Sequence, residues 1–381
     1  MSIAAYITRF SSFFPNEPVE NNEMEQYIGF VNNKSMIAKR LVLNKNGIKR
    51  RYYALNKAGQ VTHTNIEMAA NAVEGLLDEH FGLDQIELLS CGTASPEQIM
   101  PSHGVMVHGQ LKGSPQMEVV SFAGSCCTGI QALKYCYLSL LSGDVKKAVS
   151  VASERLTAWM TPNYFEKESE LLNQLSGNPI LAFEKEFLRW MLSDGGIALL
   201  VQDKPADKGI SFRIDWIELT SCANEIETCM YAGADKDAEG NLIGWAQFSE
   251  MEWLQKSIFS LKQDTRMLEK NIVPLGSRFL KEIIIPKRNF NPREVTWFLP
   301  HLSSMYFEDK IKAIIQEAGY NIPDERWFVN LPEVGNVASA SIFFALESLA
   351  QSGKLKPGDK ILLMVPESAR FSYAYALLTV V

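Results

Sequence analysis

Short apolar runs alternate along the chain with segments whose apolar residues recur at helical spacing. Runs rich in valine, leucine and isoleucine indicate strands buried on both faces of a sheet. Apolar residues three and four positions apart are typical of helices that cover such a sheet. The order predicts an α/β protein whose parallel strands are joined by crossover helices. The buried strands expected are 86–90, 119–122, 148–154 and 295–300, and the helices are 65–80, about 128–142, 306–318 and 341–351.

Weaker patterns complete the prediction. Residues 155–189 do not alternate between strand and helix. They indicate a surface insertion that either covers a site entrance or serves as a dimer-contact arm. The remaining elements expected are strands 3–10, 210–219, 327–330, 360–365 and 373–381, helices 22–30 and 34–43, paired strand segments over 190–201, and a helical region 248–285 with a break at 274–276.

The two halves of the chain resemble each other. In each, a strand leads to a turn of small residues, then to a helix that ends at Ser-Gly, then to another strand. The separation of Cys127 from Gly143 differs by about one residue from that of Asn336 from Gly353. The pattern predicts an internally duplicated fold with halves 1–205 and 206–381, in which the two turns face each other across a pseudo-two-fold axis.

The first of these turns contains two adjacent cysteines, Cys126 and Cys127, where a strand becomes a helix. Unpaired N–H groups and the helix dipole favour a thiolate at such a position, and Gly129 leaves room for a substrate. We therefore identify Cys127 as a candidate nucleophile. Taken alone, the same residues are equally typical of a buried core pair. A redox pair is a further interpretation.

Composition narrows the classes of function. The 381 residues are 46% hydrophobic and 21% charged, with net charge −7, which argues against nucleic acid as a partner. The six cysteines lack zinc-ligand or disulfide-framework spacing and predict reduced thiols in a cytoplasmic protein, with no metal and no cofactor. No apolar run reaches membrane-spanning length and no cleavable signal pattern is found. The basic clusters 39–40 and 49–51 are either solvated surface or contacts for an acidic ligand.

Two residues of the second half complete a candidate constellation. His301 directly follows a buried strand, where α/β sheets present functional side chains. Asn336 lies in the second small-residue turn and offers an amide donor. Thioester chemistry needs a thiolate, an imidazole and hydrogen-bond donors for an oxyanion or enolate. Each residue alone is more typical of a structural role, but the duplicated frame would bring both to Cys127.

The chain resembles the β-ketoacyl-acyl-carrier-protein synthase III group of the thiolase superfamily over nearly its whole length. Six motifs occur in the family's order. They are Asn46-Gly47-Ile48-Lys49-Arg50-Arg51, Thr93-Ala94-Ser95-Pro96 through Met100-Pro101-Ser102, Ser125-Cys126-Cys127-Thr128-Gly129-Ile130, Ser193-Asp194-Gly195-Gly196-Ile197-Ala198, Pro300-His301, and Gly335-Asn336-Val337-Ala338-Ser339-Ala340-Ser341.

The resemblance implies a five-layer αβαβα fold, a homodimer, and acyl-CoA or acyl-carrier-protein thioesters as partners. It implies that Cys127 carries the acyl group while His301 and Asn336 hold the thioester oxygen of a malonyl or β-ketoacyl unit. The reaction implied is a Claisen condensation. Cys126 becomes a packing neighbour. The substrate-binding positions implied are Arg50, Arg51, Met100, Ser304, Ser368 and Ala369.

The chain also departs from the family's pattern. Where the family has His-Gln-Ala-Asn, this chain has His-Leu-Ser-Ser at 301–304. The segment 366–372, which corresponds to the family's late glycine-rich loop, contains no glycine. Met100 stands where the family has a phenylalanine. Glu367 adds a carboxylate that is either a base or a surface acid. These departures indicate a specialised branch of the family. The sequence is similar to ketosynthases that form cyclohexanedione or dialkylresorcinol precursors. The alternatives are an acyltransferase that moves the acyl group to oxygen or nitrogen, and a non-catalytic partner subunit.

Overall fold

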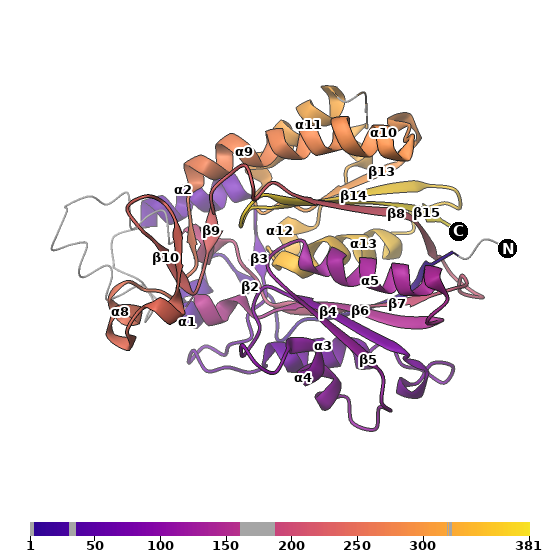
Figure 1. Cartoon of the computed structure of the whole chain (residues 1–381), viewed down its shortest axis with the longest axis horizontal. Coiled ribbons are helices and arrows are strands. Elements are labelled where there is room, and N and C mark those ends of the chain that lie inside the picture. The colour runs from indigo at the N-terminus through magenta and orange to yellow at the C-terminus, as the bar shows by residue number, and fades with distance from the viewer. Residues whose placement is uncertain (1–3, 30–35, 161–186, 318, 320–321) are drawn as a thin grey trace.

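The computed structural model describes residues 4–29, 36–160, 187–317, 319 and 322–381. The elements form five layers, with helices outside and between two halves of a sheet (Figure 1). The helix pair α3 and α4 lies below, α5 and α13 lie between the sheet halves, and α9, α10 and α11 lie above. The predicted αβαβα architecture is therefore confirmed.

In the described residues, nine strands form one sheet in the order β13-β14-β15-β8-β1-β7-β6-β4-β5. A short antiparallel pairing, Tyr6 with Arg213 and Ile7 with Phe212, joins the two halves. The first half contains β1 (Tyr6–Phe13), β4 (Leu88–Thr93), β5 (Glu118–Ala123), β6 (Lys147–Glu154), β7 (Gly195–Gln202), α3 (Asn65–Glu74), α4 (His103–Gln110) and α5 (Thr128–Ser142). The second contains β8 (Phe212–Ser221), β13 (Trp297–Pro300), β14 (Lys360–Glu367), β15 (Ser372–Val380), α9 (Thr265–Arg278), α10 (Ile285–Arg288), α11 (Glu308–Glu317), α12 (Leu331–Val334) and α13 (Ser341–Gln351).

Strand pairing shows the internal duplication directly. In the first half, β1 pairs antiparallel with β7, β7 antiparallel with β6, and β6 parallel with β4. In the second half, β8 pairs antiparallel with β15, β15 antiparallel with β14, and β14 parallel with β13. The halves differ at the outer position. The first half has the complete strand β5, whereas the second has only a parallel bridge between Phe298 and Trp327. The predicted strand 327–330 is thus reduced to one bridge. The division at 205/206 falls between β7 and β8 and remains a prediction.

Several shorter helices and strands complete the described part of the chain. They are β2 (Val19–Glu20), β3 (Arg50–Arg51), α1 (Met24–Ile28), α2 (Met36–Asn46), β9 (Met230–Tyr231), β10 (Ala234–Lys236), β11 (Leu242–Gly244), α8 (Glu250–Gln255) and β12 (Lys262–Gln263). Most of the predicted insertion 155–189 lies outside the described residues. Among the described helices, none has the length and apolar character that crossing a membrane requires. All six cysteines are free and buried.

Three local predictions are wrong. The apolar strand β5 is only half-buried, because it forms an edge of the sheet and has a partner strand on one side alone. Residues 190–201 form one strand after a 3-10 turn, rather than a strand pair. The helix α9 continues through Pro274 into a π-helical turn at Phe279–Ile284, and the break lies earlier, between α8 and α9.

The two central helices meet at their N-termini. A Cβ on Gly129 of α5 would lie 2.3 Å from the carbonyl oxygen of Ser339, so only glycine permits this approach. The buried Glu154 reinforces the contact, because its carboxylate accepts hydrogen bonds from Ser95 Oγ at 2.6 Å in the first half and Ser339 Oγ at 2.5 Å in the second. The N-terminus of α5 and the loop after β4 are thereby held next to the turn before α13.

Candidate active site

Cys127 is the N-cap residue of α5 and lies against β14 of the other half. Its side chain has no exposed surface. Its Sγ lies 3.5 Å from the carbonyl oxygen of Val365, and its backbone N–H donates to Glu367 Oε2 at 3.1 Å. The candidate nucleophile of the first half is thus held by a strand of the second.

The structure does not favour the Cys127 thiolate in the way that the sequence predicted. Burial raises the pKa of the thiol well above its usual value, and the Glu367 carboxylate and then Cys126 raise it further. The free energy by which a helix N-terminus stabilises a thiolate is only a fraction of the free energy that it costs to remove a fully buried thiolate from water. The prediction of a low-pKa thiol is therefore wrong for this resting arrangement.

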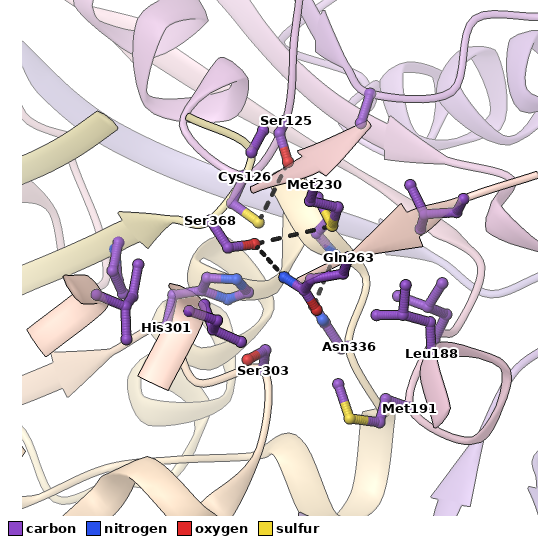
Figure 2. A pocket seen from close by; sticks show the side chains of 18 of the residues that line it. Ser125, Cys126, Leu188, Met191, Met230, Gln263, His301, Ser303, Asn336 and Ser368 are labelled. Carbon is purple, nitrogen blue, oxygen red and sulfur yellow. Dashed lines mark hydrogen bonds between the residues drawn. The ribbon is translucent and has the colours of Figure 1, made fainter. Parts of the chain in front are cut away.

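Cys126, rather than Cys127, lies at the wall of a cavity of about 210 Å³ (Figure 2). Its side chain is 7% exposed, and burial raises the pKa of its thiol to about 12. The assignment of Cys126 as a packing neighbour is therefore incomplete. The rest of the wall is mostly apolar and comes from both halves; it includes Leu156, Leu188, Met191, Leu192, Met230, Leu261, Leu268, Ile272, Val273, Leu302 and Met364.

His301 reaches the same cavity from the end of β13 (Figure 2). Its backbone N–H donates to the carbonyl oxygen of Met364 at 2.7 Å, which extends the pairing with β14. Burial lowers the pKa of the imidazole to about 4, so the ring is neutral at pH 7. Neither ring nitrogen has a hydrogen-bond partner among the described residues. The ring is therefore available as a neutral donor to a ligand oxygen.

Asn336 lines the cavity from the turn before α13. Gly335 has φ +76°, and a Cβ there would lie 2.8 Å from Ser193 Cβ, so this turn requires glycine. Backbone hydrogen bonds of 2.9 Å to Met191 and from Ser193 fix Asn336. Its Oδ1 accepts from the N–H of Ala338 at 3.0 Å, which leaves the Nδ2 amide as the donor for a ligand.

Of the six predicted substrate-binding residues, two line the cavity and four do not. Ser368 and Ala369 form part of the wall, and Ser368 Oγ accepts a 3.0 Å hydrogen bond from Gln263 Nε2. Ser304 instead caps the turn at Met305–Phe307, where its Oγ accepts from the N–H of Tyr306, and Ser303 takes the place in the wall.

Arg50, Arg51 and Met100 lie away from this cavity. Arg50 is exposed and forms an ion pair with Glu333. Arg51 is fully buried and donates to the carbonyl oxygen of Trp190, so its guanidinium cannot meet a ligand from solvent. Met100 is 83% exposed. The fold thus contradicts ligand contact for Arg51 and leaves Arg50 and Met100 as surface residues.

Sequence reasoning missed the wall formed by α9 and by β9 and β12. The spacing of Leu268 and Ile272 marks an apolar face of α9, but nothing in that pattern distinguishes a cavity wall from core. Gln263, which is 7% exposed, has no sequence signal of its own. Such residues are recognised only once the second half is folded over the first.

The sequence is similar to known proteins over most of its length. The family described as 3-oxoacyl-[acyl-carrier-protein (ACP)] synthase III C terminal matches residues 285–378. A β-ketoacyl-[acyl-carrier-protein] synthase III of Clostridium perfringens is 24% identical, with 94% of each chain covered. One from Aquifex aeolicus is 24% identical, with 84% of each covered.

Solved structures share the fold across the full chain. The tetronic acid condensing enzyme AbyA1 has a TM-score of 0.75 at 17% identity, covering 98% of this chain and 99% of that one. OleA from Xanthomonas campestris, with bound lauric acid and lauroyl-CoA, has a TM-score of 0.73 at 17% identity, covering 100% of each. The chain therefore has the fold of the thiolase superfamily. Within that superfamily, the chain is similar to β-ketoacyl-acyl-carrier-protein synthase III proteins, and its residues 285–378 match the C-terminal family of those synthases.

Proposed function

We propose that the chain is a condensing acyltransferase that joins a Cys127-bound acyl group to a malonyl or β-ketoacyl thioester. The observation that carries the proposal is that the start of α5, the end of β13 and the turn before α13 meet at one place. His301 and Asn336 line one apolar cavity together with Cys126, and Cys127 is the next residue. The apolar wall suits an acyl chain, and the two neutral donors suit a thioester oxygen.

The proposed reaction has two stages. The Cys127 thiolate attacks the acyl donor and releases its thiol, which leaves an acyl-enzyme. His301 and Asn336 then hold the carbonyl oxygen of the second thioester while its α-carbon becomes an enolate, by loss of carbon dioxide or of a proton. Attack of that carbon on the acyl-enzyme forms the new carbon–carbon bond, breaks the C–S bond to Cys127 and releases the cysteine as the thiolate. Both donors are preorganised, so they stabilise the charge where it develops.

The partners proposed are acyl-CoA or acyl-carrier-protein thioesters and a second copy of the chain, in the cytoplasm. The half-buried apolar residues of β5 support a dimer, because an edge strand exposes unpaired backbone groups unless another strand covers it. The altered loop 366–372 and the likeness to AbyA1 and OleA support a specialised lipid or polyketide pathway, with cyclohexanedione or dialkylresorcinol precursors as candidate products.

The direct test is acylation followed by product analysis. The protein is incubated with acyl-CoA and acyl-carrier thioesters of graded length, and added mass is located by tandem mass spectrometry. Cys126→Ala should still acquire the acyl mass and Cys127→Ala should not. Paired donors and malonyl or β-ketoacyl partners should then yield a product that contains both acyl units joined by a carbon–carbon bond, less carbon dioxide when the partner is malonyl.

Three results would change this proposal. Acyl mass on Cys126 in the wild type would move the nucleophile to the other cysteine. Transfer to oxygen or nitrogen without a carbon–carbon bond would identify a simple acyltransferase. Failure of every donor to acylate folded protein would contradict the function itself.

A further inference from the structure

The Cys127 turn has a carboxylate neighbour that the proposed chemistry has not used. Glu367 is the last residue of β14 and is partly buried at the N-terminus of α5. Its Oε2 accepts the 3.1 Å hydrogen bond from the Cys127 backbone N–H. The same carboxylate acts on the Cys127 thiol and raises its pKa. One side chain thus binds the backbone N–H of Cys127 and influences the reacting atom of the same residue.

The other surroundings of the thiol offer no substitute. Among the described residues, the charged or titratable groups that interact with Cys127 are Glu367, Cys126 and Tyr373, and no cation is among them. The Val365 carbonyl oxygen, 3.5 Å from Sγ, accepts a hydrogen bond but cannot keep a proton. The imidazole of His301 has no hydrogen bond to the thiol. A buried thiol without a cation needs an acceptor for its proton before it can attack a thioester.

The environment of Glu367 suits that task. Burial raises the pKa of its carboxyl above the usual value, while hydrogen bonds from the N–H of Cys127 and from Ser372 oppose the rise. The groups that face it are therefore Cys127 and Ser372, with Cys126 beyond and Glu154 acting on Cys126. A carboxylate with a raised pKa is a stronger base than one in water.

We propose that Glu367 is the general base that accepts the Cys127 thiol proton during acyl transfer. This inference rests on the proposed function. As Sγ bonds to the thioester carbon, the S–H bond breaks and its proton passes to Glu367. When the tetrahedral intermediate collapses, the C–S bond to the donor breaks, and the departing thiolate takes the same proton from Glu367. The carboxylate is thereby restored and no other reactant is needed.

The same proton transfer frees the backbone donor. In the resting arrangement the Cys127 N–H donates to Glu367 Oε2, so this N–H already serves as a donor to an oxygen beside the thiol. Once protonated, Glu367 is a weaker acceptor. The N–H then becomes available to the oxyanion that forms on the acyl donor in the same step.

The test compares wild type with Glu367→Gln, which keeps the size of the side chain and an oxygen for the Cys127 N–H. Single-turnover acylation of Cys127 is followed by mass spectrometry from pH 6 to 9. In wild type the rate constant should change little wherever Glu367 is ionised, because the proton then passes to its carboxylate. In Glu367→Gln it should be about 100-fold lower at pH 7 and rise about tenfold per pH unit. Glu367→Asp should recover part of the rate.

Controls separate the base from other effects. Glu74→Gln, an exposed glutamate of α3, should match wild type, and thermal unfolding should show that each variant is folded. If Glu367→Gln acylates as fast as wild type, or with the same pH profile, Glu367 is not the base. If wild type itself is not acylated by any donor, the proposed function fails. Alkylation of Cys127 by iodoacetamide then tests Glu367 independently, with the same difference in pH profile expected, and parallel profiles overturn the inference.

Discussion

The turns at Cys127 and Asn336 occupy equivalent places in the two halves, yet the structure uses them differently. Each follows the outer-strand position and starts a central helix. In the first half the turn buries a thiol under β14, whereas in the second a left-handed Gly335 presents an amide to the cavity. The comparison suggests that one backbone unit supplies a nucleophile on one side and a neutral hydrogen-bond donor on the other. The predictions below test this division.

The largest effect is expected for the nucleophile. Cys127→Ala should reduce condensation below detection, because the proposed acyl-enzyme forms on the Cys127 thiol. The variant should still bind acyl-CoA, since the cavity wall is unchanged. Isothermal titration with acyl-CoA and product analysis measure the two properties. Residual condensation in Cys127→Ala would contradict the assignment of the thiol to this turn.

The donor turn should affect the second stage alone. Asn336→Ala should keep acylation near the wild-type rate and slow condensation about 10²–10³-fold, the range found when one oxyanion donor is removed. Quenched-flow mass spectrometry separates acyl-enzyme formation from its consumption. Equal decreases in the rates of acylation and condensation would mean that the two turns do not act in separate stages.

The buried histidine should make stability depend on pH. The pKa of His301 is about 4 in the folded protein and about 6.5 when unfolded, so the unfolded chain binds the extra proton first as pH falls. The stabilisation is complete above pH 6.5 and is lost as the pH falls towards 4, by about 3 kcal/mol.

Urea unfolding at pH 7 and pH 4 measures this difference. His301→Asn should reduce the difference relative to wild type. His103, which is also buried and has a pKa of about 4, lies in the first half and provides a matched comparison through His103→Asn. An unchanged pH dependence in His301→Asn would show that its imidazole is not held neutral by burial.

The smallest effect concerns the packing that joins the turns. Gly129→Ala should destabilise the fold by about 1–3 kcal/mol, since its Cβ would overlap the Ser339 carbonyl oxygen. Gly109→Ala is the control, because its Cβ would meet no atom within 4 Å in the exposed helix α4. It should leave the free energy of unfolding unchanged or raise it slightly. Equal values for both variants would argue against close contact between α5 and α13.

The sequence predicts those parts of the site that depend on local pattern. The two turns, the helices after them and the strand before His301 follow from small residues and periodicity within short segments. The duplicated order of strands follows from the same patterns. Helix 341–351 was predicted with the bounds that the structure shows.

Other features depend on contacts between distant segments. Sequence spacing does not reveal that Cys126 lies at the cavity wall, that Glu367 reaches Cys127 from β14, or that Arg51 is buried. The half-burial of β5 also could not be predicted, because a central strand and an edge strand that pairs with another chain can have the same apolar composition. These features arise when the second half packs on the first.

The carboxylate of Glu154 has an evolutionary consequence. It belongs to the first half by sequence, but it accepts hydrogen bonds from Ser95 in that half and Ser339 in the other. After a gene duplication, the two copies of a unit ordinarily accumulate substitutions independently. Here the loss of the Glu154 carboxylate would remove hydrogen bonds from the loop after β4 and from the turn before α13 at once, so one substitution in the first half would also disturb the second.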